Sequence, residues 1–576
     1  MSFRAIPAAV DLPAVEHSIL KFWRDNSIFE KTVAAREGAP TWTFYEGPPT
    51  ANGMPGTHHI EARVFKDLFP RFHTMKGKQV TRKAGWDCHG LPVEIAVEKE
   101  LGFSGKGDIE KYGIAPFNDK CRESVQRHVS AFTDMTDRMG FWVDFDEAYW
   151  TMSPEYVESV WWSLKEIWKK GLLVQDHRVA PYCPRCGTGL SDHELAQGYE
   201  TVTDPSVFVR FPITSGDLAA LKASLLVWTT TPWTLVSNTA IAVHPDVEYV
   251  AIEVTEEETT EVLVVAKNLM DAVKGEKKIL KTMLGKELER VTYKRPFDYV
   301  EIPDAHFVVL ATYVTTEDGT GIVHTAPTFG ADDAKVAADA GVPPLLVKDE
   351  QGNLVPLVDL RGKFRPELAD PMFGFGEEYI KAEYLTDEEK EAELAKQQML
   401  LKPIIPELKA YLSVDERIAL KLKLENKAFK IEKYEHSYPH CWRTDKPVLY
   451  YPLDSWFIKS TEKKDQMIAL NKTINWKPAS TGTGRFGNWL ENLNDWNLSR
   501  SRFWGIPLPI WSTEEGDEHL CIESAAQLKE EIEKAIGSLP RKEFWKLTDQ
   551  LIARREEAWD AQLEADAAAG RLDTLW

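Results

Sequence analysis

Helical spacing of apolar residues marks the first part of the chain, and strand-like apolar runs mark its middle. Residues 12–29 place Val15, Ile19 and Phe22 at intervals of three or four, with Trp23 beside them. This spacing predicts an amphipathic helix that packs on the outside of a sheet.

Residues 41–77 have the pattern of a strand, a turn and a helix. The run at 41–46 predicts a buried strand, and the glycines and prolines of 47–56 predict a turn. Residues 57–77 then predict a helix, followed by a strand at 79–85. The helix has one apolar face, formed by Ile60, Val64 and Leu68.

A second amphipathic helix is expected after a polar, helical stretch that reaches about Arg138. Ser153 is a typical N-cap, Pro154 suits the first helical position, and Gly171 suits the end. The apolar residues between them have the spacing of a buried stripe, so its tryptophans are expected in the core. The stripe consists of Val157, Val160, Trp161, Leu164, Ile167 and Trp168.

The pattern changes after residue 200. Seven short runs rich in Val, Ile and Leu predict strands at 206–213, 224–230, 239–244, 248–254, 262–266, 306–314 and 321–327. Their close spacing predicts an all-β, barrel-like domain inserted between about 200 and 400. Residues 385–435 are expected to return the chain through helices.

Composition indicates a globular protein of several domains. The chain has 576 residues, 43% hydrophobic and 28% charged, and a formal net charge of -21. The N-terminus has no apolar signal-peptide core and no run is long enough to span a bilayer, so a soluble cytoplasmic protein without a membrane partner is expected.

The negative charge disfavours a nonspecific nucleic-acid binder, but basic residues gather around the first strand–helix–strand unit. They are Arg63, Lys66, Arg71, Lys76, Lys78, Arg82 and Lys83. A solvated helix face and an RNA-contacting patch both remain open interpretations.

Two glycine-bearing turns carry the strongest functional signal. GPPTANG at 47–53 and GWDCHGLPVE at 85–94 each precede a helix, where free N–H groups and close backbone approach suit phosphate binding. These residues resemble class I isoleucyl-tRNA synthetases of the eukaryote-like bacterial type. The block at 489–511 is similar to a further family block, and the resemblance spans about residues 5–525.

The resemblance implies a fold and an activity. The fold is α/β, a Rossmann-like parallel nucleotide-binding fold with an incomplete second half and a large inserted β-barrel-like editing domain. The activity is ligation of isoleucine to tRNA(Ile) with ATP and Mg2+, and the protein is expected to be a monomer. Catalysis of this kind depends on positioning and electrostatic stabilisation.

The family's synthetic site maps onto this chain residue by residue. Asp87 matches the acid that holds the substrate amino group, and Pro48 and Trp504 match the isoleucine pocket. ATP is expected at Gly47, Gly53, Gly56 and His59. Without the family context, Asp87 would be read as a helix cap.

One family signature is altered. Relatives carry His-x-Gly-His after the proline of the first turn, whereas this chain has Gly56, Thr57, His58 and His59. His59 is expected to contact phosphate in the transition state, and His58 stands where the family keeps a glycine. We favour a variant that reshapes the ATP pocket over decay of the site, because both flanking turns are intact.

Residues 228–245 and 319–333 resemble the two halves of the family's editing pocket. Thr229, Thr230 and Thr231 are expected to position the tRNA hydroxyl and the attacking water. His324 and Asp333 match the residues near the side chain and the ammonium group of the mischarged amino acid. Taken singly, these residues have simpler interpretations: threonines are common in strands, and an aspartate before a helix commonly caps it.

Cys183 and Cys186 form a CxxC, completed in many relatives by a second pair that here reads Cys441 and Thr444. Structural zinc sites are usually four-coordinate, so the three cysteines favour the absence of Zn2+ over a bound ion. His440 would need unusual geometry to supply the fourth ligand.

Four segments are expected: 1–198, the first half of the catalytic domain with a cysteine knuckle; 199–410, the editing domain; 411–525, a connective region and the start of the second half; and 526–576, a helical tail unlike the family. The family's KMSKS loop is not found, so we expect a C-terminally truncated chain without isoleucine-dependent ATP–pyrophosphate exchange. A freestanding aminoacyl-tRNA deacylase and a noncatalytic tRNA-binding fragment are the alternatives.

Overall fold

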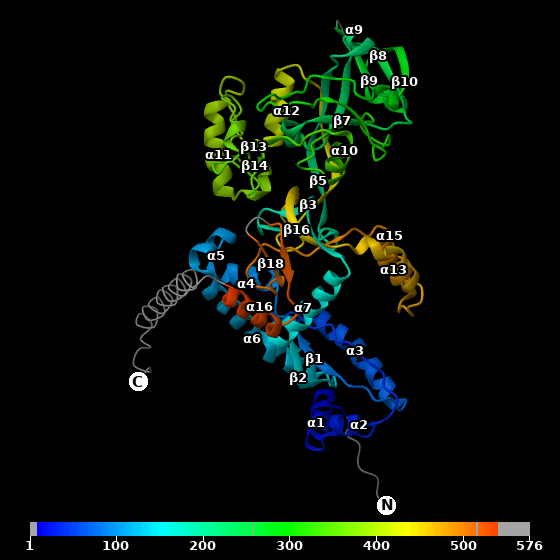
Figure 1. The fold of residues 1–576 in the computed structure, drawn as a ribbon, viewed down its shortest axis with the longest axis vertical. Helices are drawn as coiled ribbons and strands as arrows, with labels where there is room; N and C mark the ends of the chain where they lie inside the picture. Colours follow the sequence, from blue (N-terminus) through cyan, green and yellow to red (C-terminus); the bar gives the residue numbers. More distant parts are fainter. Residues whose placement is uncertain (1–8, 257–258, 514–515, 539–576) are drawn as a thin grey trace, which may run out of the picture.

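The computed structural model describes residues 9–256, 259–513 and 516–538 (Figure 1). It is a mixed α/β structure. Residues 9–170, 464–513 and 516–538 form its lower region in Figure 1, and residues 199–256 and 259–439 form its upper region. The two are joined by β3 (Leu173–Cys183) and β16 (Leu449–Ile458), which pair antiparallel along their whole length.

Helices dominate the first region. They are α1 (Leu12–Asp25), α2 (Ile28–Ala34), α3 (Thr57–Met75), α4 (Leu91–Leu101), α5 (Lys106–Tyr112), α6 (Ile114–Arg138) and α7 (Pro154–Lys169). The predicted helix at 12–29 ends earlier, because Ser27 adopts a left-handed conformation with φ 48°. The helix predicted at 57–77 is confirmed, and so is that after Ser153, whose side chain caps Tyr156 N.

A small parallel sheet lies among these helices. β1 (Lys83–Trp86) pairs in parallel with β2 (Asp144–Trp150). Parallel bridges from Thr41 to Gln79 and from Thr50 to Asp87 place segment 41–50 on the other side of β1. The buried strand predicted at 41–46 is wrong: the segment is extended without regular pairing, and Tyr45 is 89% exposed.

The upper region contains all seven predicted strands. Its strands are β5 (Tyr199–Pro212), β6 (Ser224–Thr229), β7 (Ala240–Val243), β8 (Glu248–Glu256), β9 (Thr259–Ala266), β10 (Glu276–Leu284), β11 (Phe307–Leu310), β12 (Ile322–Thr325), β13 (Leu346–Lys348), β14 (Leu354–Pro356) and β15 (Ala428–Pro439). They form a six-stranded sheet in the order β10-β8-β9-β6-β5-β15 and a three-stranded sheet β11-β7-β12, beside the hairpin β13-β14.

The prediction that this region is all-β is wrong. It also contains α9 (Gly216–Ala220), α10 (Ala331–Ala340) and α11 (Asp387–Leu400), and α12 (Val414–Leu424) precedes β15. The helices expected at 385–435 are confirmed as α11 and α12, but residues from Ala428 form a strand. β15 runs antiparallel to β5 from Ala428 to Pro439, so the two chain ends of this region lie side by side.

The remaining elements close the lower region. They are β4 (Thr188–Gly189), α8 (Asp192–Leu195), α13 (Lys464–Asn471), α14 (Ala479–Thr483), α15 (Arg485–Glu491), β17 (Trp496–Asn497), β18 (Ile510–Ser512), β19 (His519–Cys521) and α16 (Ala525–Ser538). The tail predicted at 526–576 is helical as far as Ser538, and 539–576 lie outside the described residues. Among the residues described, no helix combines the length and hydropathy needed to cross a bilayer.

The cluster of basic residues is largely internal. Arg63 and Arg82 are buried, and Arg63 Nε donates a hydrogen bond of 2.8 Å to Thr136 Oγ1. Arg71 donates to the carbonyl of Gly140, and Lys66 Nζ lies 2.6 Å from Glu46 Oε1. These four cations hold α3 against its neighbours and do not form a free patch for RNA. Lys76 and Lys83 are exposed, so both interpretations stay open for them.

Candidate active and editing sites

The start of α3 brings three predicted site residues together. Gly56 is the N-cap, and its N–H donates to His59 Nδ1 at 2.9 Å. The rings of His58 and His59 are 3.9 Å apart. Burial lowers the pKa of His59, and the neighbouring His58 and Arg63 lower it further. A neutral His59 that accepts at Nδ1 carries its proton on Nε2, where it is available to an anion.

His58 is exposed and lies close over Gly56. A Cβ built on Gly56 would meet His58 Cε1 at 3.0 Å, so a side chain at position 56 would displace this ring. The two changes relative to the family therefore fit each other. The His58 ring occupies the space that a side chain at position 56 would need, and glycine at 56 leaves that space open.

The second group of site residues surrounds Asp87. Thr50 Oγ1 donates to Asp87 Oδ2 at 2.8 Å, and Asp87 N donates to the Pro49 carbonyl at 3.0 Å. Trp504 is buried, and its indole N–H donates to the Cys88 carbonyl at 2.5 Å. The chain from Gly47 to Gly53 thus reaches Asp87 through Thr50, which sequence reasoning did not single out.

Both groups rest on one apolar cluster that includes Trp86, Phe132 and Trp504. The ring of His59 meets Phe132 edge-on at 4.9 Å. Among the described residues no hydrogen bond joins His58 or His59 to Asp87 or Trp504.

Trp504 is positioned by a buried ion-pair network that sequence reasoning missed. Arg502 bonds to Glu94 and to Glu98, both fully buried on α4, and Glu98 also meets Arg185 Nη1 at 3.0 Å. Glu94 Oε1 accepts from the backbone N–H of Phe503 at 2.9 Å. The signal in the sequence is Glu94 and Glu98 spaced by four on an otherwise apolar helix face.

The predicted editing residues form a hydrogen-bonded chain. Thr231 N donates to Thr229 Oγ1 at 3.1 Å, and the hydroxyls of Thr231 and Thr234 lie 3.4 Å apart. Thr234 Oγ1 is 2.9 Å from His324 Nε2. Thr230 is half-buried and makes no side-chain hydrogen bond to another described residue. Thr234, three residues after Thr231, is the member that sequence reasoning missed.

Asp333 lies in the first turn of α10, close to the end of β12. Its carboxylate accepts from Ala326 N at 2.9 Å and from the Tyr313 hydroxyl at 3.0 Å. Burial raises the pKa of Asp333 from its ordinary value, although both hydrogen bonds oppose the change. A Cβ on Gly330 would lie 2.8 Å from Asp333 Oδ2, so glycine at position 330 leaves room for this carboxylate.

His324 is buried on β12, and burial lowers its pKa to about 4. Its Nδ1 has no hydrogen-bond partner among the described residues. Since Ala326 follows His324 by two residues, the hydroxyl chain and the Asp333 carboxylate meet at one end of β12. The site therefore combines hydroxyls, a neutral imidazole and a carboxylate that has two donors.

A buried charge pair supports this site from behind. Asp415 Oδ1 accepts from Trp233 N at 2.8 Å, two residues after Thr231. Lys381 Nζ lies 3.2 Å from Asp415 Oδ2 and 3.3 Å from Asp204 Oδ2. The pair fixes the 3-10 turn Pro232–Ser237 to α12, and its members are far apart in the sequence, so no local signal predicted it.

Cys183, Cys186 and Cys441 are brought together and buried, with all three sulfur atoms within 4.8 Å of one another. Cys186 and Cys441 sulfur atoms are 3.7 Å apart. Thr444 Oγ1 lies 3.8 Å from Cys183 Sγ, whereas His440 Nδ1 is hydrogen-bonded to the Tyr438 carbonyl. The donor set suits a thiophilic ion but supplies three thiolates of a tetrahedron.

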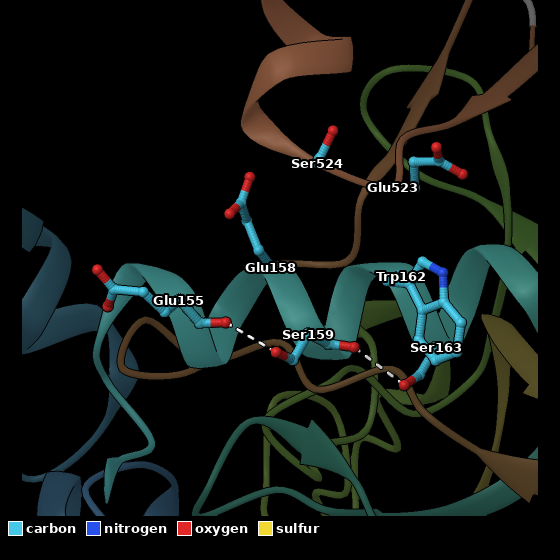
Figure 2. A pocket seen from close by; sticks show the side chains of 7 residues that line it. All are labelled: Glu155, Glu158, Ser159, Trp162, Ser163, Glu523 and Ser524. Atoms are coloured by element: carbon cyan, nitrogen blue, oxygen red, sulfur yellow. Dashed lines mark hydrogen bonds between the residues drawn. The ribbon is translucent and has the colours of Figure 1, made fainter. Parts of the chain in front are cut away.

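A hollow of about 530 Å³ lies between α7 and the start of α16 (Figure 2). Carboxylates of Glu155, Glu158 and Glu523 line it, with Trp162 at one end. Ser159 and Ser163 turn their hydroxyls back to carbonyls of their own helix. No predicted site residue lines this hollow, so it is not part of the site described above.

Comparison with known proteins identifies relatives of this chain. The profile of the tRNA synthetases class I (I, L, M and V) matches residues 18–563, beyond the stretch of about 5–525 over which the sequence resembles the family. The chain is 56% identical over 532 residues to an isoleucine–tRNA ligase of Streptomyces avermitilis, covering 92% of this chain and 46% of the relative. The chain is also 55% identical to an isoleucine–tRNA ligase of Thermobifida fusca, and the match covers 92% of this chain and 45% of that relative.

Among solved structures, a LeuRS–tRNA–LeuAMS ternary complex of Agrobacterium radiobacter K84 is 16% identical at a TM-score of 0.33, over 89% of this chain and 52% of that one. The chain spans less than half the length of the two ligases that it resembles. The matched profile covers most of the chain, and the chain therefore belongs to the class I tRNA synthetases of the isoleucine, leucine, methionine and valine group.

Proposed function

We propose that this chain is the part of an isoleucine–tRNA ligase that carries the amino-acid activation residues and the whole of an editing site. Its substrates would be isoleucine, ATP with Mg2+, and tRNA(Ile). Identity of 55–56% to isoleucine–tRNA ligases supports the choice of amino acid.

A Rossmann-like nucleotide-binding fold is supported by the parallel arrangement of 41–50, β1 and β2. On this proposal, 1–198 and 411–525 belong to the catalytic domain and 199–410 to a barrel-like editing domain, with 526–576 as a tail. The antiparallel pairs β3–β16 and β5–β15 would be the stalk that connects the two domains.

In the synthetic site, the Nε2–H of His59 and the free N–H groups of α3 would bind the phosphates of ATP. Gly47, Gly53 and Gly56 would let the nucleotide approach the backbone. Asp87, oriented by Thr50, would hold the ammonium group of isoleucine, and Pro48 and Trp504 would line the pocket for its side chain. His58 would border the adenine position.

The editing site is the better supported of the two, and one observation carries the proposal: a half-buried carboxylate with two donors lies beside a chain of hydroxyls. Asp333 would bind the ammonium group of the misacylated valine. Thr229, Thr230 and Thr231 would orient the terminal ribose hydroxyl and the attacking water, and neutral His324 would hold the hydroxyl chain in place. Selection against valine needs such a site, because a pocket discriminates weakly against a missing methylene; this enzyme family is the established example.

The experiment is hydrolysis of Val-tRNA(Ile) by the chain and by Asp333→Ala, with Asp332→Ala as a matched control. Asp332 is the exposed neighbour in the same helical turn. Loss of a charge pair with the ammonium group should slow hydrolysis by roughly 10²-fold in Asp333→Ala. The control should keep the rate of the unmodified chain. Undiminished hydrolysis by Asp333→Ala contradicts the assignment.

A freestanding aminoacyl-tRNA deacylase is the second candidate, and it is favoured by the fact that every editing residue lies within the described chain. A noncatalytic tRNA-binding protein is the third. A gel-shift titration across salt separates them, since phosphate contacts make affinity fall with ionic strength. Salt-sensitive binding without hydrolysis would favour the noncatalytic protein.

Zinc would be held by Cys183, Cys186 and Cys441 and would brace the knuckle between β3 and β16. Their buried thiols fit the ion, but the described residues offer no fourth cysteine or histidine within the cluster. We therefore propose no step of the reaction that depends on zinc.

A further inference from the structure

Residues 459–491 form a small helical projection between two strands of one sheet. The projection contains the 3-10 turn Ser460–Lys463 and the helices α13, α14 and α15, and Figure 1 shows α13 and α15 beside the junction of the two regions. It begins where β16 ends and closes where β17 pairs with β16, at Ile458 and Trp496. Because β16 also pairs with β3 along its length, the projection is attached to the strands that join the lower and upper regions.

The charge of the projection differs from that of the whole chain. The chain has a formal net charge of -21, whereas residues 459–485 contain six basic residues and two acidic ones, Glu462 and Asp465. The basic residues are Lys459, Lys463, Lys464, Lys472, Lys477 and Arg485. Within the part of the chain that the structure describes, none of the six forms an ion pair, although Arg178 at the base of the projection is paired with Asp495. Cations without carboxylate partners favour a polyanion as the ligand.

Aromatic residues alternate with these cations along the projection. The ring centroids of Trp476 and Phe486 are 5.2 Å apart, and those of Phe486 and Trp489 are 5.6 Å apart. Trp489 ends this row of rings and is 39% exposed. An exposed indole offers stacking to a nucleobase, and unpaired cations offer charge to its phosphates. Single-stranded nucleic acids are bound by this combination.

A hollow of about 390 Å³ lies between α13, α14 and α15. Its apolar lining includes Ile468, Ile474 and Leu490. Lys472 and Asn475 also line it, and their side chains make no hydrogen bond to another described residue. A nucleobase has apolar faces and a polar edge, so this lining suits an unstacked base.

Trp476 lines the hollow and also begins the row of rings. Its indole N–H donates to Asn471 Oδ1 at 2.8 Å, and the buried Asn471 amide donates to the Gly482 carbonyl at 2.9 Å. A Cβ on Gly482 would lie 2.1 Å from Trp476 Cδ1, so glycine at this position lets the indole lie against α14. The wall of the hollow is therefore formed before a ligand binds, which lowers the ordering cost of binding.

We propose that the projection binds the single-stranded end of tRNA, the end that carries the amino acid. Its cations contact the phosphates, Trp489 stacks on one base, and the hollow accepts a second base. The inference rests on the proposed function, because the tRNA end would visit both sites and pass the junction at which the projection is attached. It adds a binding site that shares no residue with the synthetic or the editing site.

The test is a gel-shift titration of the full chain with two probes: an uncharged tRNA(Ile) transcript and the same transcript without its single-stranded end. The unmodified chain should bind the complete transcript at least fivefold more tightly. Trp489→Ala should weaken binding of the complete transcript at least fivefold, because base stacking is lost, and should leave the trimmed one unchanged. Trp162→Ala removes another exposed tryptophan, on α7, and should bind both probes normally.

Lys472→Ala is an independent variant at the hollow. Loss of one phosphate contact should weaken binding of the complete transcript roughly fourfold at physiological salt and lower the slope of log affinity against log salt by roughly 0.7. Lys402→Ala, at an exposed lysine of the upper region, should leave both quantities unchanged. Both lysines are exposed, so neither change should alter the thermal midpoint of the chain.

Affinity for the complete transcript that both Trp489→Ala and Lys472→Ala leave unchanged overturns the inference. Equal weakening of the complete and the trimmed transcript also overturns it, because the contact would then be to another part of the tRNA. Binding of uncharged tRNA requires no editing residue. Binding as expected without hydrolysis of Val-tRNA(Ile) would therefore contradict the proposed function, whereas hydrolysis together with unaltered binding by the two variants would contradict this inference alone.

Discussion

At the scale of single residues, His324 is a neutral side chain under physiological conditions. Burial lowers its pKa from 6.5 to about 4, and Thr234 engages its Nε2. Between these two values the unfolded chain binds a proton at this position that the folded chain does not. Stability from this residue is therefore fully present above pH 6.5 and is lost as pH falls toward 4.

We expect the free energy of unfolding, measured in urea, to be lower at pH 5 than at pH 7, and His324 should account for about 2 kcal/mol of the decrease. His324→Asn should reduce the pH dependence of stability by that amount, because asparagine does not titrate. His17→Asn, on exposed α1, is the matched control. Identical pH dependence in His324→Asn and the unmodified chain would contradict a depressed pKa.

Thr444 stands where the cysteine cluster lacks its fourth thiol, 3.8 Å from Cys183 Sγ. Thr444→Cys should complete a tetrahedral site and bind Co2+ roughly tenfold or more tightly than the unmodified chain. The visible absorption of tetrahedral cobalt thiolate measures this directly. Thr473→Cys adds a thiol at an exposed position away from the cluster and should have no such effect. Equal affinity in both variants would contradict the geometry.

The candidate sites were predictable from sequence wherever the residues lie in a contiguous motif. Gly56 to His59 and Thr229 to Thr231 are such cases, and the structure places each group together. Thr50, Thr234 and Tyr313 were not singled out, although their hydroxyls orient the predicted side chains. Their partners lie 37, 90 and 20 residues away, so only the fold brings them into contact.

At the scale of secondary-structure elements, Arg502 couples the block at 499–505 to α4. Its guanidinium bonds to Glu94 and Glu98, which are fully buried. Removing the cation leaves two buried carboxylates without their main partner, and breaking a buried pair costs about 3–5 kcal/mol.

Arg502→Met should therefore lower the free energy of unfolding by that amount in a urea titration. Arg127→Met breaks an exposed pair with Glu100 and should leave the unfolding midpoint unchanged. If the two variants unfold at the same denaturant concentration, the network does not hold Trp504 in place as described.

Elements with a strong local period were predicted well, and those decided by pairing were not. The seven apolar runs of the upper region are strands, α3 begins directly after the predicted turn, and α7 begins after its predicted cap, Ser153. β10 was missed because EKKILKTML is rich in lysine, and its strand state depends on pairing with β8. Likewise AFKIEKYEHSYP is strand and not helix, since it pairs with β5 along its length.

The error at 41–46 has a different physical cause. TWTFYE has high strand propensity, and among the described residues its one bridge runs from Thr41 to Gln79. No strand in the described part of the chain pairs with its other edge, so the segment is extended but neither regular nor buried. Propensity predicted the backbone conformation, whereas burial depends on what covers the edge.

At the scale of the whole molecule, the residues proposed for synthesis and those proposed for editing lie in different regions joined by two antiparallel strand pairs. The upper region has its own large apolar core, so the geometry of its site does not depend on the packing of the lower region. We therefore expect hydrolysis of Val-tRNA(Ile) to be a property of the upper region.

The measurement that tests the proposed function most directly is the hydrolysis rate of Val-tRNA(Ile) against that of Ile-tRNA(Ile), in excess enzyme and under identical conditions. The account predicts faster hydrolysis of the valyl ester by the unmodified chain, with Ile-tRNA(Ile) close to its rate in buffer. Equal rates for the two esters, or no rate above buffer for either, would contradict it.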